Sequence, residues 1–306
     1  MEYNLKKLAP IILFTYNRPW HTRQTIEALQ KNTLADQSDL IIYSDAPKDK
    51  SAIDLVNQVR VHIKNIKGFK SLKVIERSEN WGLAKSIISG VTEVIEEYDK
   101  VIVLEDDIVT SPAFLSFMNQ ALELYANDER VMHISGYSYP IEKAGLPETF
   151  FLKPTTCWSW ATWGKSWQHF QKDSEAVIKL FDKRMIKDFN LNGAYNYFQQ
   201  VEYNHIGILN TWAIFWYAST YLQKGLSLHP RDSYAHNIGH DSMGENCGVS
   251  NDFDVELTNN LSKVAKIEIV ESSSSRMAYE KYFNSIKPRL HKRVVRKLKS
   301  LLRDKR

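Results

Sequence analysis

The sequence has few cysteines, no long apolar run and no glycine-rich phosphate loop, and each absence excludes a class of protein. With only two cysteines, Cys157 and Cys247, in 306 residues, a disulfide framework is excluded and a reducing compartment is expected. No apolar run reaches the length of a membrane span, and residues 1–10 contain no signal-peptide core. We therefore expect a cytoplasmic protein.

Two phosphate-binding signatures are also missing. There is no Gly-x-x-x-x-Gly-Lys-Ser/Thr segment, which excludes P-loop phosphoryl transfer. No Gly-x-Gly-x-x-Gly follows the first expected strand, which argues against a dinucleotide dehydrogenase. The segment after that strand, Thr15-Tyr-Asn-Arg-Pro19, contains no glycine at all, whereas a sugar-nucleotide pyrophosphorylase is expected to carry a glycine-rich loop there.

The formal net charge of +4 is unevenly distributed. Residues 287–306 contain ten lysines and arginines and one acid, so this tail carries +9 and the remaining chain −5. A mildly acidic body does not suit a nucleic-acid-binding domain, which carries basic residues across a folded face. Apolar residues recur at helical spacing over 286–302, which predicts a basic amphipathic helix. Such a helix lies on an anionic membrane surface, or else packs on the domain with its basic face in water. We expect Ser272–Ser275 to begin the linker to it.

Apolar runs alternate with helical patterns in the first 140 residues. We expect buried strands at 10–16, 40–44, 72–75 and 101–109, separated by helices with apolar residues at three- and four-residue spacing. A helix capped by Ser111-Pro112 and running to Tyr125 should follow, with further strands at 131–134 and 226–228. This alternation predicts an α/β fold with a mostly parallel sheet flanked by helices, whose strand carboxyl ends share one edge.

The most informative stretch is Val101-Ile-Val-Leu-Glu-Asp-Asp-Ile-Val109, in which a buried strand runs into three carboxylates. Adjacent carboxylates at a strand end repel one another and lose solvation, so a cation stabilises them. Oxygen ligands suit magnesium, manganese or calcium. Because side chains alternate along a strand, Glu105 and Asp107 should share one side and Asp106 face the other, unless the strand ends at Leu104. Alternatively, the acids solvate a strand end or favour the next helix N-terminus.

Other polar residues follow the expected strands and should meet these carboxylates at the same edge. They are Thr15 to Asn17, Asp45, and Asn80 to Lys85, with Gly82 in the last turn. Such a crevice suits a nucleoside diphosphate whose charge a metal neutralises, with Asp45 accepting hydrogen bonds from the base or ribose.

Beyond Pro140 the sequence is rich in tryptophan. Trp158, Trp160, Trp163 and Trp167 fall within ten residues, and Trp212 and Trp216 lie on a helix expected to begin near Asn210. These side chains can form a core stripe or platforms that stack on sugar faces. The glycine-containing loop at 237–251 is expected to close over the site as a lid.

Two segments, Phe-Thr-Tyr-Asn-Arg-Pro at 14–19 and the carboxylate strand with Ser111-Pro-Ala-Phe114, resemble glycosyltransferases of the GT-A fold. The closest likeness is to the N-acetylglucosaminyltransferase I family and to bacterial family 2 enzymes that build surface polysaccharides such as O-antigen or capsule. The resemblance covers roughly residues 9–250. It implies a transferase domain at 1–275, with a nucleotide-sugar half at 1–140 and an acceptor half at 141–275, and a basic tail at 276–306.

The resemblance implies metal-dependent, inverting transfer from a nucleotide-sugar donor, expected to be UDP-linked, to a glycan acceptor. The acceptor is expected to be lipid-linked, with the enzyme held at the inner face of the plasma membrane by its tail. A catalytically weakened glycan-binding protein of the same fold is the alternative.

Carried over to this chain, the resemblance implies that Asp107 binds Mn²⁺ or Mg²⁺, and that Glu105 and Asp106 contact the ribose and the donor sugar. The nucleotide would be surrounded by Thr15, Asn17, Arg18, Asp45, Asn80, Gly82 and Lys85.

The resemblance places the catalytic base at position 210, but this chain has Asn210, and an amide cannot accept a proton. We therefore expect Asp241 to be the base, with Asn210 orienting the acceptor; reduced activity is the other possibility. The expected acceptor platform is formed by Trp158, Trp160 and Trp212.

Overall fold

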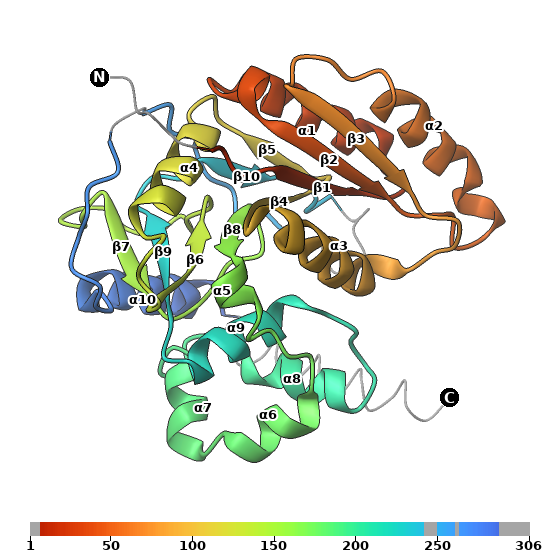
Figure 1. Ribbon diagram of the computed structural model, residues 1–306. Coiled ribbons are helices and arrows are strands. Elements are labelled where there is room, and N and C mark those ends of the chain that lie inside the picture. The colour runs from red at the N-terminus through yellow and green to blue at the C-terminus, as the bar shows by residue number, and fades with distance from the viewer. Residues whose placement is uncertain (1–6, 242–249, 261–262, 288–306) are drawn as a thin grey trace.

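The computed structural model describes residues 7–241, 250–260 and 263–287. An eight-stranded sheet in the order β3-β2-β1-β4-β8-β6-β9-β7 forms its centre (Figure 1). A two-stranded antiparallel sheet, β5 with β10, lies beside it. The strands are β1 (Ile11–Thr15), β2 (Asp39–Ser44), β3 (Ser71–Glu76), β4 (Lys100–Glu105), β5 (Ile108–Thr110), β6 (Val131–Ser135), β7 (Thr149–Leu152), β8 (Trp160–Trp163), β9 (Leu226–Pro230) and β10 (Ala235–Asn237).

The α/β fold class expected from the sequence is confirmed. In the large sheet, all strands but β8 and β7 run in the same direction. The helices are α1 (Pro19–Gln30), α2 (Ile53–Ile63), α3 (Gly82–Tyr98), α4 (Phe114–Leu124), α5 (Gly164–Trp167), α6 (Ser174–Leu180), α7 (Lys183–Phe189), α8 (Phe198–His205), α9 (Ala213–Leu222) and α10 (Ser273–Ile286). None in the described part of the chain has both the length and the apolar character needed to cross a bilayer.

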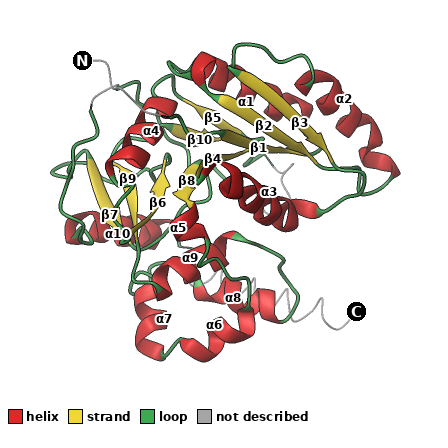
Figure 2. Ribbon diagram, viewed as in Figure 1, coloured by secondary structure: helices red, strands yellow, loops and turns green. Residues whose placement is uncertain are grey.

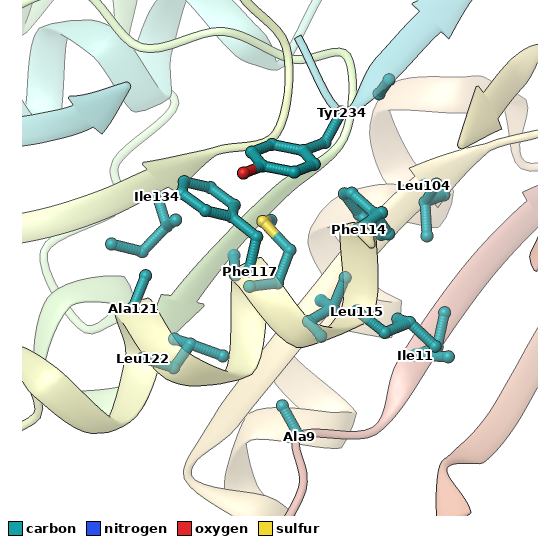
Figure 3. Packing of buried hydrophobic residues seen from close by; sticks show 14 of the residues in the cluster. Ala9, Ile11, Leu104, Phe114, Leu115, Phe117, Ala121, Leu122, Ile134 and Tyr234 are labelled. Carbon is teal, nitrogen blue, oxygen red and sulfur yellow. The ribbon is translucent and has the colours of Figure 1, made fainter. Parts of the chain in front are cut away.

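The two faces of the parallel strands are covered by different helices. Along β1, Ile11 and Leu13 pack in the cluster that includes residues of α1, α2 and α4, whereas Ile12 and Phe14 pack in the cluster with α3. This alternation follows the two-residue period of a strand. Because both faces are covered, the first four residues of β1 are all apolar. Figure 3 shows the α4 side, where Phe117 stacks on Tyr234 with ring centroids 4.5 Å apart.

The second half of the chain does not form a sheet of its own. Its strands β7, β8 and β9 complete the large sheet, while α6 to α9 form a helical group below it (Figures 1 and 2). Residue 140 is therefore no boundary between sheets. The sequence analysis did not predict β7, β8 or β10. In the case of β8, the strand coincides with the tryptophan segment and is buried at every position, so it shows no alternation.

Two expected helix starts are wrong. The helix after Ser111-Pro112 begins at Phe114, because the Phe114 amide donates to the Ser111 carbonyl at 3.1 Å and the Ser111 hydroxyl does not cap it. The helix expected near Asn210 begins at Ala213.

The linker expected at Ser272–Ser275 is also wrong. The Ser272 hydroxyl caps α10 by accepting a hydrogen bond from the Ser275 amide, so these serines begin a helix. Tyr279 and Phe283 of α10 are buried in the core of the helical group. Residues 276–286 thus belong to the folded domain, and most of the amphipathic helix expected at 286–302 lies outside the described residues.

Trp160, Trp167, Trp212 and Trp216 pack in one core cluster, and the stack between two of them provides a test. Trp160 is 1% exposed and stacks on Trp212, which is 3% exposed, with centroids 5.2 Å apart. Replacing Trp160 with alanine should lower the free energy of unfolding by about 3–5 kcal/mol. Urea unfolding measures this, with Tyr203→Ala on the surface of α8 as the control. Unchanged stability would show that the stack is not part of the core.

Candidate functional site

The three carboxylates lie where the chain passes from the large sheet into the small one. β4 ends at Glu105 and β5 begins at Ile108, with Asp106 and Asp107 forming a turn between them. The carboxylates thus lie at the carboxyl end of the strand, as expected, and the strand ends close to Leu104 instead of continuing through Asp107. Both aspartates are buried, each 4% exposed.

The turn brings Asp106 and Asp107 to the same partner, Arg18. One guanidinium nitrogen of Arg18 donates to Asp106, and the other lies 2.9 Å from Asp107 Oδ2. The expectation that the two aspartates face opposite sides is wrong, because they lie in a turn and not in a strand. Burial opposes the charge on Arg18, but the two carboxylates outweigh it and raise the pKa of Arg18 above its ordinary value.

Arg18 is placed by the start of α1. It is the N-cap residue, and Pro19 follows at the first helical position, which suits a helix start. About two turns further along α1, the Thr25 hydroxyl donates to the Asp106 carbonyl at 2.8 Å. The Asn-Arg-Pro segment and the acidic turn are thus fixed to each other by side chains of one helix.

One guanidinium faces three acids, so Glu105 and Asp106 hold a proton more tightly than isolated carboxyl groups do. Burial, and then the charge of Asp107, raises the pKa of Glu105 to about 8, with Arg18 opposing the shift. Burial also raises the pKa of Asp106, again against the effect of Arg18. One guanidinium therefore does not balance three carboxyl groups, and a divalent cation would.

The residues present fit such a cation. Asp107 Oδ1 is buried and has no hydrogen-bond partner among the described residues, while its other oxygen contacts Arg18. No three His, Cys, Asp or Glu side chains in the described ranges are arranged to hold a metal together. One open carboxylate oxygen suits Mg²⁺ and similar ions that take their remaining ligands from water and a substrate's phosphates.

A glycine passes directly over Asp107. β10 pairs with β5, and the Ile238 amide donates to the Asp107 carbonyl at 2.9 Å. A Cβ atom added to Gly239 would lie 2.1 Å from Asp107 Oδ2 and 3.1 Å from an Arg18 nitrogen. The chain can approach the carboxylate this closely only without a side chain. A glycine in a loop was the sole indication of this contact in the sequence.

Asp241 lies two residues further along the same segment. Its Oδ2 is 3.0 Å from Nε2 of His21. The two groups form an ion pair when the imidazole is protonated, but they are not aligned as a hydrogen bond. The Asp241 side chain is 39% exposed, whereas that of His21 is only 2% exposed. Sequence reasoning missed His21, although it follows Arg18 by three residues and so shares a face of α1 with it. Residues 242–249 of the expected lid lie outside the described ranges.

Asp45 has a structural role, which corrects the expectation that it binds base or ribose. Its two oxygens accept hydrogen bonds from the amides of Ala46, Trp81 and Gly82 at 2.8–2.9 Å, and from Asn80 Nδ2 at 3.1 Å. Four donors fill the acceptor capacity of a carboxylate. Asp45 therefore fastens the Asn80 turn and the start of α3 to the end of β2.

This fastening predicts a loss of stability. Replacing Asp45 with alanine leaves buried amide donors without partners and should lower the free energy of unfolding by about 1–3 kcal/mol. Denaturant unfolding measures the change, and Asp54→Ala, an exposed aspartate in the first turn of α2, is the matched control. Equal stability of the two variants would contradict the role.

The remaining nucleotide candidates are only partly brought together. The Thr15 hydroxyl donates to the Tyr43 carbonyl at 3.4 Å, at the end of β1 beside Glu105, and Asn17 follows, half-buried. Lys85 is 59% exposed, and its ammonium lies 4.0 Å from the centre of the Trp81 ring. Its described contacts are with Trp81 and Glu79 and not with the acidic turn.

The expected acceptor residues are largely not placed for that role. Trp160 and Trp212 are buried in the core and cannot stack on a sugar, which corrects their assignment. Trp158 is half-buried and packs edge-to-face against His240, with centroids 5.2 Å apart, so it does border the segment that carries Asp241. Asn210 is exposed and accepts a hydrogen bond from Lys172.

Among the solved structures to which the chain is similar, two are of one protein. No family model and no curated protein matches the chain. Structures of S. aureus TarS, a wall teichoic acid glycosyltransferase, are similar to it. One match has 16% identity and a TM-score of 0.32, and covers 46% of this chain and 23% of the other. The second, to TarS residues 1–349, has 14% identity and a TM-score of 0.44, and covers 75% of this chain and 60% of the other.

The chain thus spans less than two thirds of either matched structure, and likenesses this low assign no activity to it. Neither match is an N-acetylglucosaminyltransferase I, so that closer likeness remains an interpretation of the sequence.

Proposed function

We propose that the chain is a metal-dependent, inverting glycosyltransferase that uses a nucleotide-sugar donor, UDP-linked as the sequence resemblance implies. The observation that carries the proposal is the acidic turn at the carboxyl end of β4. There, Arg18 balances part of the charge, and one buried oxygen of Asp107 has no hydrogen-bond partner among the described residues. Open α/β sheets bind ligands at this edge.

In this proposal Asp107 holds Mn²⁺ or Mg²⁺ through Oδ1. When bound, the cation neutralises the charge that develops on the leaving diphosphate. Arg18 fixes the orientation of Asp106 and Asp107 from one side. Glu105 and Asp106 contact the ribose and donor sugar, and the ends of β1 and β2 border the nucleotide. Gly239 lets the Asp241 segment lie against the acidic turn.

Asp241 is the proposed base, accepting the proton of the acceptor hydroxyl as the new bond forms. His21 contacts the Asp241 carboxylate from the buried side at 3.0 Å. The Asp241 side chain is partly exposed, which leaves room for the acceptor hydroxyl. The acceptor is proposed to be a glycan, lipid-linked at an anionic membrane surface, since residues 287–306 carry +9.

The test is a UDP-release assay with UDP-glucose, UDP-galactose and UDP-N-acetylglucosamine, with and without Mn²⁺, over a panel of glycoside acceptors. We expect Mn²⁺-dependent release that a suitable acceptor accelerates. Calorimetry with the same donors measures binding separately. If no donor bound and none released UDP, the proposal would be overturned.

A second candidate function, glycan binding without catalysis, is favoured by Asn210 alone, because the residue at that position cannot act as a base. Donor binding without turnover on any acceptor would support it over the transferase.

A further inference from the structure

An exposed tryptophan stands beside the proposed base. Trp20 is 58% exposed, and no other tryptophan in the described residues is among the exposed large apolar side chains. It lies in the first turn of α1, between Arg18 and His21. Packing accounts for the buried tryptophans, whereas the exposed ring of Trp20 is available to a ligand.

The Trp20 ring is held against the same imidazole that contacts Asp241. The rings of Trp20 and His21 meet edge-to-face, with centroids 4.9 Å apart and planes at 89°. His21 Nε2 lies 3.0 Å from Asp241 Oδ2, and the His21 ring itself is buried. One imidazole therefore separates the exposed indole from the carboxylate, and its burial fixes the orientation of both.

This placement favours the acceptor over the donor. The donor's diphosphate belongs at Asp107, whereas an acceptor hydroxyl must lie within about 3 Å of its base. The ring that carries this hydroxyl then lies on the exposed side of Asp241, and Trp20 is an exposed aromatic ring that contacts the same imidazole. The aliphatic face of a pyranose suits the flat apolar surface of an indole.

We propose that Trp20 is the stacking platform for the acceptor's pyranose ring, in the place of the buried Trp160 and Trp212. The inference rests on the proposed function, because it takes Asp241 as the base. It names the acceptor class as a pyranoside that presents one hydroxyl to Asp241 while its apolar face covers Trp20.

The experiment uses the full chain with p-nitrophenyl β-glycosides of glucose, galactose and N-acetylglucosamine as acceptor probes. Trp20→Ala should raise the KM for the glycoside by about tenfold or more, with a smaller change in kcat, and Trp20→Phe should restore most of the loss. Tyr203→Ala, which removes a partly exposed aromatic ring from α8, is the control and should behave as the wild type.

Saturation-transfer NMR gives a readout that needs no turnover. Signal transfer from the wild-type protein to the glycoside should fall in Trp20→Ala and return in Trp20→Phe. Equal transfer and equal KM in wild type and Trp20→Ala would overturn the platform, as would no transfer to any glycoside in the wild type. Loss of liposome binding in Trp20→Ala, with glycoside binding intact, would overturn it in favour of a membrane contact.

The two proposals can fail separately. Glycoside binding that depends on Trp20, without UDP release on any acceptor, would support the platform and overturn the transferase. Equal UDP release and transfer in the wild type and in Trp20→Ala would support the transferase and overturn the platform.

Discussion

Replacing Asp107 with asparagine is expected to lower sugar transfer by about a thousandfold. The substitution keeps the shape of the side chain but removes the charge that would bind a cation through Oδ1, the buried oxygen without a described partner. Stabilisation of a leaving group by a metal is worth several kcal/mol, and each 1.36 kcal/mol is a factor of ten in rate. The rate of UDP release at saturating Mn²⁺ measures the effect.

The fold should survive this substitution, because Arg18 keeps Asp106 as its partner. Thermal unfolding checks this, and Mn²⁺ titration followed by electron paramagnetic resonance should show the loss of binding directly. Asp36→Asn, which changes an exposed aspartate that takes part in none of the ion pairs named above, is the matched control. A wild-type rate for Asp107→Asn in Mn²⁺ would mean that Asp107 is not the metal ligand.

Replacing Gly239 with alanine is the second large effect we expect. Its Cβ would lie 2.1 Å from Asp107 Oδ2, a separation that real structures do not tolerate, so the carboxylate or the loop must move. Asp107 cannot move freely because Arg18 holds that same oxygen at 2.9 Å. A displacement of about 1 Å in a catalytic group costs on the order of a hundredfold in rate.

We therefore expect transfer to fall by about a hundredfold, while the overpacking lowers the free energy of unfolding by only about 1–3 kcal/mol. Gly145→Ala is the comparison. Gly145 has φ +76° and no atom near its would-be Cβ, so that substitution strains a loop without touching the site. It should cost some stability and no activity. If the two variants lost equal activity, the contact between Gly239 and Asp107 would have no special role.

Local sequence patterns were sufficient for the parallel half of the sheet. The apolar runs of β1, β2 and β4 are buried on both faces, and such runs separated by helical spacing admit few other arrangements. The same pattern located the acidic turn at a strand's carboxyl end. It failed for β8, because four consecutive buried residues rich in tryptophan have neither a helical nor a strand period.

Local sequence patterns did not predict the direction of the side chains in the candidate site. The spacing of residues predicts local secondary structure. It does not predict the contact between Arg18 and Asp106, which are 88 residues apart in the chain. The same limit explains the errors at Asp45, whose oxygens are filled by an amide turn 35 to 37 residues away, and at Trp160 and Trp212.

The sequence by itself determined the order of strands and helices in the parallel half of the sheet and the concentration of acid at the end of β4. Only the tertiary structure decided which groups meet: Asp106 and Asp107 both face Arg18, β10 pairs with β5 and carries Gly239 over Asp107, and Asp241 lies against His21. Long-range strand pairing fixes these directions, and its energy comes from residues that are distant in the chain and carry no local signature of their partners.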